Sequence, residues 1–210
     1  MSLSPVAEAY LTALLRGDPR AARVIVDTAL ADGMRLQELY LDVFQQALYE
    51  VGRRWQDGEA TVAQEHLATA TTQTLAARLS SWLAAVPESG RTAVVTGTEG
   101  ELHALGPRFV GDFLEGEGWT VIDLGASTPS ADLVRAVAEH RPELVCLSTT
   151  LPANLAQAQA AVAGLRRLPD RPLIAVGGGA YRRDPAIARE IGADVHAADA
   201  AEFLQVIGGR

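Results

Sequence analysis

Apolar residues in the first part of the chain recur at intervals of three and four, which is typical of helices that bury one face. The pattern covers residues 5–86 and is interrupted by three short segments that combine aspartate with glycine or proline. Four helices fit between these breaks, and the last is expected to begin near residue 61 and to continue through Trp82. The breaks lie at residues 17–19, 31–33 and 56–58. This part of the chain therefore predicts a four-helix bundle.

After a linker at residues 87–90, short apolar runs alternate with amphipathic segments, which predicts a parallel β-sheet covered by helices on both faces. The expected strands are 92–96, 120–123, 144–148, 173–176 and 194–196, and the expected helices are 105–117, 130–140, 154–168, 184–191 and 200–207. Five strands with five helices match a flavodoxin-like (Rossmann-type) domain. The sequence thus predicts an α/β protein, with a four-helix domain at residues 1–86 and a sheet domain at residues 91–210. Ligands of such sheets bind at the carboxyl ends of the strands, near the point where the strand order reverses.

Composition limits the chemistry that this protein can perform. The 210 residues carry a net charge of −8, all 18 basic residues are arginine, and no basic cluster with interleaved aromatic residues occurs. Direct binding of nucleic acid is therefore disfavoured, and the lack of lysine excludes Schiff-base catalysis. The single cysteine, Cys146, excludes an internal disulfide and is expected in the core. No apolar run approaches the roughly 20 residues of a membrane span and no signal peptide is recognisable, so we expect a cytoplasmic protein.

The candidate chemistry lies in the loop after the first predicted strand, at His103. Glu101 precedes it by two residues, so in an extended loop the carboxylate can reach the ring nitrogen that faces away from a ligand. Gly106 leaves room for a large group near the backbone. The hydroxyl side chains of residues 148–150 are expected on the rim of the same edge of the sheet, where glycines at residues 177–179 also lie. For His103 taken alone, a structural polar residue is the alternative. A phosphate-binding loop is disfavoured because neither the nucleotide fingerprint nor the phosphate-loop lysine is present.

The run acidic-x-His-x-x-Gly from Glu101 to Gly106, a serine-rich end of the third strand and a Gly-Gly after the fourth resemble the cobalamin-binding domain of methionine synthase, corrinoid methyl carriers and B12-dependent photoreceptors. The resemblance covers nearly the whole chain. It implies that His103 is the lower axial ligand of cobalt, in place of the dimethylbenzimidazole of the cofactor. Ser148 would contact the displaced tail. The family usually has aspartate at the position of Glu101. The longer carboxylate of glutamate can still reach His103, so we expect His103 to ligate cobalt, with electronic properties of the cobalt that differ from those in the family.

The helical part contains Trp55, followed after nine residues by Glu65 and His66. Taken singly, these residues are interpreted as a core aromatic and a polar patch on a helix. As a set they resemble the B12-dependent photoreceptors, in which such side chains shield the upper face of adenosylcobalamin. The resemblance implies a sensor in which light breaks the cobalt–carbon bond and the helical cap loses contacts that hold it closed. DNA-binding members carry a histidine directly after the tryptophan, but this chain has Gln56, which leaves His66 as the candidate ligand of the light state.

The resemblance also implies a set of cofactor-binding residues, with His103 as the metal ligand. The set is Trp55, Val62, Glu65, His66, Glu101, Leu102, His103, Ala104, Leu105, Gly106, Ser148, Thr150, Leu151, Gly177 and Gly178. The two glycines would line the slot of the displaced tail. His140 and His196 lack such a context and are interpreted as structural.

We expect no DNA-binding domain ahead of the first helix, and in this the chain resembles the stand-alone photocobilins, which pair cobalamin with a bilin. The expected cofactor is adenosylcobalamin with its cobalt, and a bilin such as biliverdin is an open alternative as a second chromophore. The expected partners are a signalling protein or further copies of the chain, with no nucleic acid, no membrane and no enzymatic role. Two other functions stay open, a corrinoid methyl-carrier subunit of a methyltransferase system and a cobalamin carrier. Methyl carriers must expose the upper face to partner enzymes, so a tryptophan that covers it favours the sensor.

Overall fold

A computed structural model describes residues 3–80, 86–182, 184–197 and 199–208 of the chain. The chain divides into two compact units, one within residues 1–82 and one within residues 83–210. We call them the helical unit and the α/β unit. Among the described residues, no helix is both long enough and apolar enough to cross a membrane.

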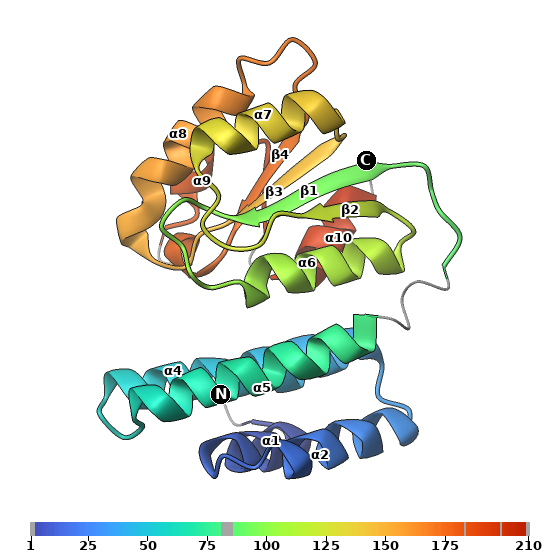
Figure 1. The fold of residues 1–210 in the computed structure, drawn as a ribbon, viewed down its shortest axis with the longest axis vertical. Helices are drawn as coiled ribbons and strands as arrows, with labels where there is room; N and C mark the ends of the chain where they lie inside the picture. Colours follow the sequence, from blue (N-terminus) through green and yellow to red (C-terminus); the bar gives the residue numbers. More distant parts are fainter. Residues whose placement is uncertain (1–2, 81–85, 183, 198, 209–210) are drawn as a thin grey trace. The chain divides into compact units, whose positions relative to one another are not determined.

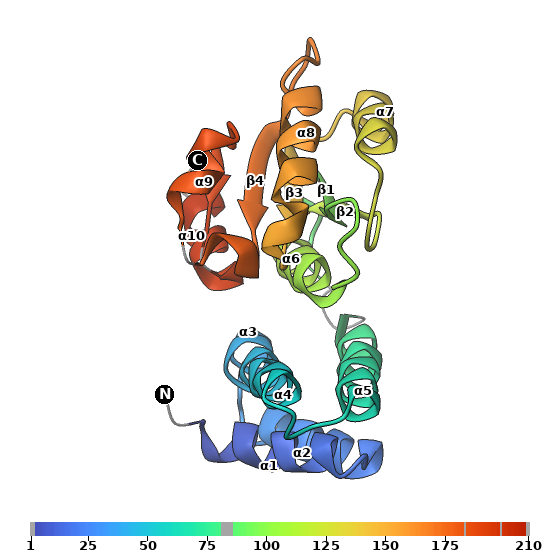
Figure 2. The ribbon, with the colours of Figure 1, turned by 90° about the vertical axis from the view of Figure 1, so that its left-hand side faces the viewer.

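Among the described residues, the helical unit is built from four helical segments. Figures 1 and 2 show their course. They are α1 (Pro5–Leu15), α2 (Pro19–Ala31), a continuous segment of α3 (Leu36–Glu38), the π-helical η1 (Leu39–Gln45) and α4 (Gln46–Gln56), and finally α5 (Val62–Ser80). Helices α1 and α2 both begin with a side-chain cap followed by proline. The Ser4 hydroxyl accepts the N–H of Ala7, and the Asp18 carboxylate accepts the N–H of Ala21. The four predicted helices are confirmed. The π-helical stretch was not expected, and Trp82 lies outside the described residues.

Aromatic packing dominates the core of the helical unit. The rings of Tyr10 and Tyr40 lie 5.2 and 5.5 Å from the ring of Phe44, and all three side chains are fully buried. The Tyr10 hydroxyl is paired at 3.0 Å with Oγ1 of Thr72 on α5, so the polar atom of this buried ring is satisfied. These contacts join α1, η1 and α5 in one core.

The α/β unit is built on a five-stranded parallel sheet in the order β2-β1-β3-β4-β5. The strands are β1 (Thr92–Gly97), β2 (Thr120–Asp123), β3 (Leu144–Ser148), β4 (Leu173–Gly177) and β5 (Val195–His196). The chain moves outward from β1 to β2 and then returns to place β3 on the other side of β1. The strand order therefore reverses between β1 and β3, and the predicted flavodoxin-like fold is confirmed.

Helices cover both faces of this sheet (Figure 1). They are α6 (Leu105–Gly116), α7 (Ser130–His140), α8 (Leu155–Leu165), α9 (Ala186–Glu190) and α10 (Ala200–Gly208), with 3-10 turns η3 (Pro152–Asn154) and η4 (Gly179–Tyr181). Buried residues of α7, α8 and α9 pack on one face, and those of α6 and α10 on the other. Cys146 belongs to the second core, where burial raises the pKa of its thiol.

Several predicted boundaries differ from those observed. The strands β1 and β4 each extend one residue further, to Gly97 and Gly177, and β5 starts at Val195. The helix predicted over 154–168 ends at Leu165, because Arg167 and Leu168 bond to the carbonyls three residues earlier and tighten the last turn. The helices predicted over 105–117, 184–191 and 200–207 run over 105–116, 186–190 and 200–208.

Candidate functional site

The loops that follow β1 and β3 meet at the carboxyl edge of the sheet, where the strand order reverses. Paired strands bring Gly97 and Ser148 side by side at this edge. Thr98, the first residue beyond β1, donates its N–H to the carbonyl of Ser148 at 3.0 Å. In open α/β sheets this reversal point is where ligands bind. His103 therefore lies in the loop that the topology marks as the ligand site.

Glu101 is fully buried beneath this loop, and both of its carboxylate oxygens have hydrogen-bond donors. The Nδ1 atom of His103 contacts Oε1, and Oε2 accepts the N–H groups of Thr150 and Leu151 at 2.7 and 3.0 Å. Burial raises the pKa of this carboxyl, but the hydrogen bonds from His103, Leu151 and Thr150 outweigh it, so the pKa lies below its ordinary value. Glu101 is therefore a fixed, ionised acceptor.

That acceptor determines which nitrogen of His103 is left for a ligand. An ionised carboxylate only accepts, so Nδ1 carries the proton and Nε2 holds the free lone pair. The His103 side chain is 52% exposed, and Nε2 has no hydrogen-bond partner among the described residues. The contact expected from the spacing of Glu101 and His103 is present. The site thus offers one imidazole nitrogen without a protein partner among the described residues, on a ring whose orientation is fixed by the carboxylate behind it.

Asn154 is a member of this network that the sequence analysis missed. It ends the η3 turn, and its side-chain amide donates to Oε2 of Glu101 at 3.3 Å. An asparagine in the loop that follows the third strand belongs to the same edge as Ser148, and this placement was the available signal. The sequence analysis used residue 154 only as the start of a helix.

Thr149 does not lie on the rim, although its hydroxyl was expected there with those of Ser148 and Thr150. It is fully buried, and its Oγ1 is paired at 2.8 Å with Oγ1 of Thr98. The rim expectation is therefore wrong for Thr149. Thr150 reaches the site through its backbone N–H, which donates to Glu101.

The glycines of the site differ in how much space surrounds them. A Cβ on Gly106 would lie 2.7 Å from Oγ of Ser148, so these two predicted residues are neighbours. A Cβ on Gly178 would lie 2.4 Å from the carbonyl oxygen of Thr149, and φ there is +107°, a conformation open essentially to glycine alone. A Cβ on Gly177 would meet only the Ala197 carbonyl oxygen, at 3.6 Å. The end of β4 is therefore too tight for a side chain at Gly178, whereas a methyl group at Gly177 would make only an ordinary contact.

Large apolar side chains are exposed beside His103. Leu102 is 81% exposed and Leu151 is 47% exposed. Ala104 and Leu105 follow at the start of α6 and are half-buried. Exposed apolar groups around a polar ligand atom suit a large, mostly apolar ring better than a small ion.

The four remaining predicted residues lie on the helical unit. Trp55, in the last turn of α4, is 46% exposed, and Val62, at the start of α5, is 51% exposed. Glu65 accepts the Thr69 hydroxyl at 3.0 Å, and the His66 side chain is 74% exposed. Residues 62, 65 and 66 share one face of α5 by their spacing. Trp55 is thus an exposed aromatic rather than the core residue of the alternative interpretation.

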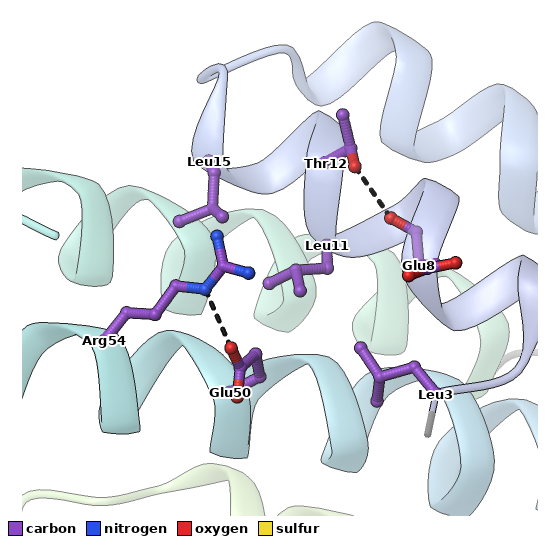
Figure 3. A pocket seen from close by; sticks show the side chains of 7 residues that line it. All are labelled: Leu3, Glu8, Leu11, Thr12, Leu15, Glu50 and Arg54. Atoms are coloured by element: carbon purple, nitrogen blue, oxygen red, sulfur yellow. Dashed lines mark hydrogen bonds and ion pairs between the residues drawn. The ribbon is translucent and has the colours of Figure 1, made fainter. Parts of the chain in front are cut away.

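A hollow of about 320 Å³ lies elsewhere on the helical unit, between α1 and α4 (Figure 3). Leu11 and Leu15 line it together with Glu50 and Arg54, and no predicted site residue is among its walls. Arg54 donates to Glu50 at 2.8 Å. Hydrogen bonds from Arg53 and Arg54 outweigh burial and lower the pKa of Glu50 to about 2. These ion pairs fix the last turns of α4, where Trp55 is attached.

Comparison of the sequence with models of protein families identifies the family of this chain. Models of families described as B12 binding domain match residues 6–80 and 91–206, the second alone covering more than half of the chain. The chain belongs to the B12-binding family. It is a cobalamin-binding protein with the fold class that the sequence predicted.

Two kinds of relative occur among B12-binding proteins of similar sequence. The chain is 33% identical over 190 residues to the HTH-type transcriptional repressor CarH of Myxococcus xanthus, covering 90% of this chain and 62% of the repressor. It therefore spans less than two thirds of that relative. It is 28% identical over 188 residues to the trimethylamine corrinoid protein of Methanosarcina barkeri, covering 85% of this chain and 84% of the relative. The monomethylamine corrinoid protein of Methanosarcina barkeri shares the fold, with a TM-score of 0.85 at 21% identity over 96% of each chain.

The residues of the α/β unit fit the B12 cofactor. The cofactor brings its own cobalt, so the protein would need to offer only one nitrogen ligand. Nε2 of His103 is such an atom, and no described cluster of three or more His, Cys, Asp or Glu residues could hold a metal by itself. Leu102 and Leu151 offer exposed apolar surface beside His103. We expect these residues to hold the cofactor from its lower face.

Removing the charge of Glu101 is expected to destabilise this B12-binding unit even without cofactor. In Glu101→Gln the new NH₂ group faces either the N–H groups of Thr150 and Leu151, where donors oppose one another, or Nδ1 of His103, which then has to accept and moves its proton to Nε2. In both cases the buried N–H groups lose a charged acceptor. We expect a loss of about 1–3 kcal/mol in the free energy of unfolding, measured by denaturant titration of the cobalamin-free protein. The exposed Glu143, which pairs with Arg91, provides a matched control. Glu143→Gln should change stability by less than about 0.5 kcal/mol, and an equal effect of both variants would contradict the network.

Proposed function

We propose that this cobalamin-binding protein is a light sensor that uses adenosylcobalamin, held by His103 below and shielded by Trp55, Glu65 and His66 above. The observation that carries the proposal is the exposed Trp55, followed after nine residues by Glu65 and His66 on an exposed face of α5. A regulator, the repressor CarH, is among the relatives and has 33% identity. Cobalamin binding follows from membership of the B12-binding family, whereas the proposal of light sensing depends on these three side chains.

The side chains of the helical unit suit contact with an adenosyl group. The Trp55 indole offers a flat apolar surface that excludes water, and the Glu65 carboxylate and His66 imidazole offer polar partners for a ribose or a base. Adenosylcobalamin, when bound, supplies a cobalt–carbon bond that visible light breaks. In the dark, these side chains would hold the adenosyl group. Without that group they would lose the contact, and the conformational population of the helical unit would shift. A protein partner or a further copy of the chain reads out that shift.

Dark and illuminated samples distinguish a sensor from a carrier. Free adenosylcobalamin is itself light-sensitive, so the decisive signal is a change in the protein rather than in the absorption spectrum alone. We expect green light to change amide hydrogen exchange in residues 55–69 and the elution volume of the loaded protein. Protein loaded with hydroxocobalamin, which has no adenosyl group, is the control and should not respond. An absorption change with unaltered exchange and elution would reject the sensor.

Trp55→Ala is expected to weaken the binding of adenosylcobalamin by about tenfold, because the lost aromatic contact corresponds to roughly 1.5 kcal/mol or more of buried apolar surface. The affinity for hydroxocobalamin should stay unchanged, since it has no adenosyl group for the indole to cover. Titration in the dark, followed by absorption, measures both constants. Tyr49→Ala removes another exposed aromatic from α4 and is the matched control. Equal losses for both cobalamins would contradict the role of Trp55 above the ring.

The second candidate is a corrinoid methyl-carrier subunit, supported by the 28% identity to a trimethylamine corrinoid protein over 84% of that relative. A carrier must leave its upper face open to a partner enzyme. It therefore predicts that Trp55→Ala does not discriminate between the two cobalamins and that light leaves hydrogen exchange unaltered. The same two experiments thus decide between carrier and sensor.

A bilin as second chromophore is part of the proposal for a stand-alone sensor. Cys146 is the single cysteine and is buried in the sheet core, so a bilin would bind without a thioether link. The absorption spectrum of protein purified from its native host reports the corrin and any bilin in separate bands. A denatured sample from which all colour can be extracted would agree with non-covalent binding.

A further inference from the structure

The loop between β2 and α7, residues 124–129, holds the segment that carries His103 from the side opposite to β3. Oγ of Ser127 accepts the N–H of Gly100 at 3.0 Å. Oε2 of Glu99 accepts the N–H of Ser130 at 3.1 Å and its hydroxyl at 3.3 Å. Residues 99 and 100 are therefore attached to the start of α7, while Glu101 is attached to the loop after β3.

Ser127 is held in a conformation that its residue type disfavours. Its φ is +54°, in the left-handed region, which costs a residue with a Cβ about 1–2 kcal/mol. Such a conformation persists when the surroundings over-determine it. The contact that accompanies it here is the hydrogen bond to Gly100, which has a positive φ of +82° itself. The strained Ser127 is thus hydrogen-bonded to the glycine that precedes Glu101 and His103.

Glu99 takes the place of a missing helix cap. The N-cap residue of α7 is Pro129, which has no side-chain acceptor, and the carboxylate of Glu99 reaches the first N–H of the helix instead. A carboxylate at a helix N-terminus is favoured by both the free N–H groups and the helix dipole. Capping by Glu99 therefore ties the orientation of the His103 loop to α7.

Further bonds keep the loop and the end of β1 at a fixed separation. Oγ1 of Thr96 is paired with Oγ1 of Thr128 at 2.7 Å. The N–H of Gly97 donates to the Gly125 carbonyl at 2.8 Å, and the N–H of Thr128 donates to the Gly97 carbonyl at 3.2 Å. Movement of residues 124–129 would therefore move the base of the loop that carries His103.

From this geometry we propose that Ser127 and Glu99 are positioning residues for the axial histidine. The network of Glu101 fixes the histidine loop on the β3 side, and the bonds of Ser127 and Glu99 fix it on the α7 side. With both sides held, the imidazole keeps one orientation before cofactor arrives, which lowers the ordering cost of binding. This inference rests on the proposed ligation by His103 and assigns a second support to it.

The test compares Ser127→Ala with Ser127→Gly. Both remove the acceptor of the Gly100 amide, but only glycine also relieves the left-handed strain, so the pair separates positioning from stability. We expect both variants to exchange the Gly100 amide about fivefold faster in cobalamin-free protein and to bind hydroxocobalamin about fivefold more weakly. Glu99→Ala should weaken binding about tenfold, since it removes a charged acceptor. Ser127→Asn, which tolerates the left-handed region and keeps an acceptor, should restore both values.

Ser89→Ala is the matched control, because the Ser89 hydroxyl also bonds to a loop backbone, at the carbonyl of Gly118. It should leave the Gly100 amide and the cobalamin affinity unchanged. The electron paramagnetic resonance of the cobalt(II) form adds a direct readout, since an axial nitrogen splits the cobalt lines. A wild-type signal without nitrogen splitting would refute ligation by His103 itself. Nitrogen splitting in the wild type, with wild-type affinity and exchange in Ser127→Ala and Ser127→Gly, would refute the positioning role alone.

Discussion

His103→Ala is expected to weaken cobalamin binding by about 100-fold or more and to remove imidazole ligation from the absorption spectrum of the loaded protein. Loss of a residue that only supports a metal ligand already costs about 10–100-fold in affinity, and this substitution removes the ligand. No other described imidazole is hydrogen-bonded to the Glu101 network, so no replacement is in place. Equilibrium titration with hydroxocobalamin measures the change.

His140→Ala controls for the loss of a histidine as such, because His140 is exposed at the end of α7 and has no contact with the network. It should bind as the wild type does. Added free imidazole should restore part of the spectrum of His103→Ala by entering the space left behind. Equal affinity and an unchanged spectrum in His103→Ala would show that the cofactor is held in another way.

Gly178→Ala should be the most destabilising single-methyl change at the site. The new Cβ would lie 2.4 Å from the carbonyl oxygen and 2.8 Å from the carbonyl carbon of Thr149, both backbone atoms that cannot rotate away. The φ of +107° adds strain of about 1–3 kcal/mol. We expect a total loss of at least roughly 3 kcal/mol in the free energy of unfolding, measured by denaturant titration.

Gly177→Ala is the matched variant one residue earlier. Its Cβ meets only the Ala197 carbonyl oxygen, at an ordinary contact distance of 3.6 Å, so stability should change by less than about 1 kcal/mol. If Gly177 borders the slot of the cofactor tail, this variant should bind cobalamin more weakly while it remains folded. Loss of stability in both variants to the same extent would contradict the difference in packing between Gly177 and Gly178.

The sequence predicted the parts of the site that depend on local spacing. Glu101 and His103 are two residues apart in an extended loop, so their contact could be expected before the fold was known. The strands and the order of elements followed from the alternation of apolar runs, and they place the loop after β1 beside the loop after β3.

Contacts between distant segments were the parts that spacing could not predict. Asn154 reaches Glu101 across 53 positions of sequence, and Ser127 reaches Gly100 across 27. Thr149 is turned inward because Thr98 offers it a buried partner, a choice that depends on the pairing of two strands. The π-helical stretch from Leu39 to Gln45 was missed for a different reason, since it contains no glycine or proline that would indicate an irregular helix.

Ligation by a protein histidine is tested most directly by isotope labelling. Protein with ¹⁵N-labelled histidine is loaded with cobalamin, reduced to cobalt(II) and compared with unlabelled protein by electron paramagnetic resonance. Because the two nitrogen isotopes differ in nuclear spin, ligation by histidine predicts that the nitrogen splitting changes its pattern with the label and that this dependence on the label is absent in His103→Ala. A splitting that is identical in labelled and unlabelled protein would show that the axial nitrogen belongs to the cofactor, and the account of His103 as the lower ligand would be wrong.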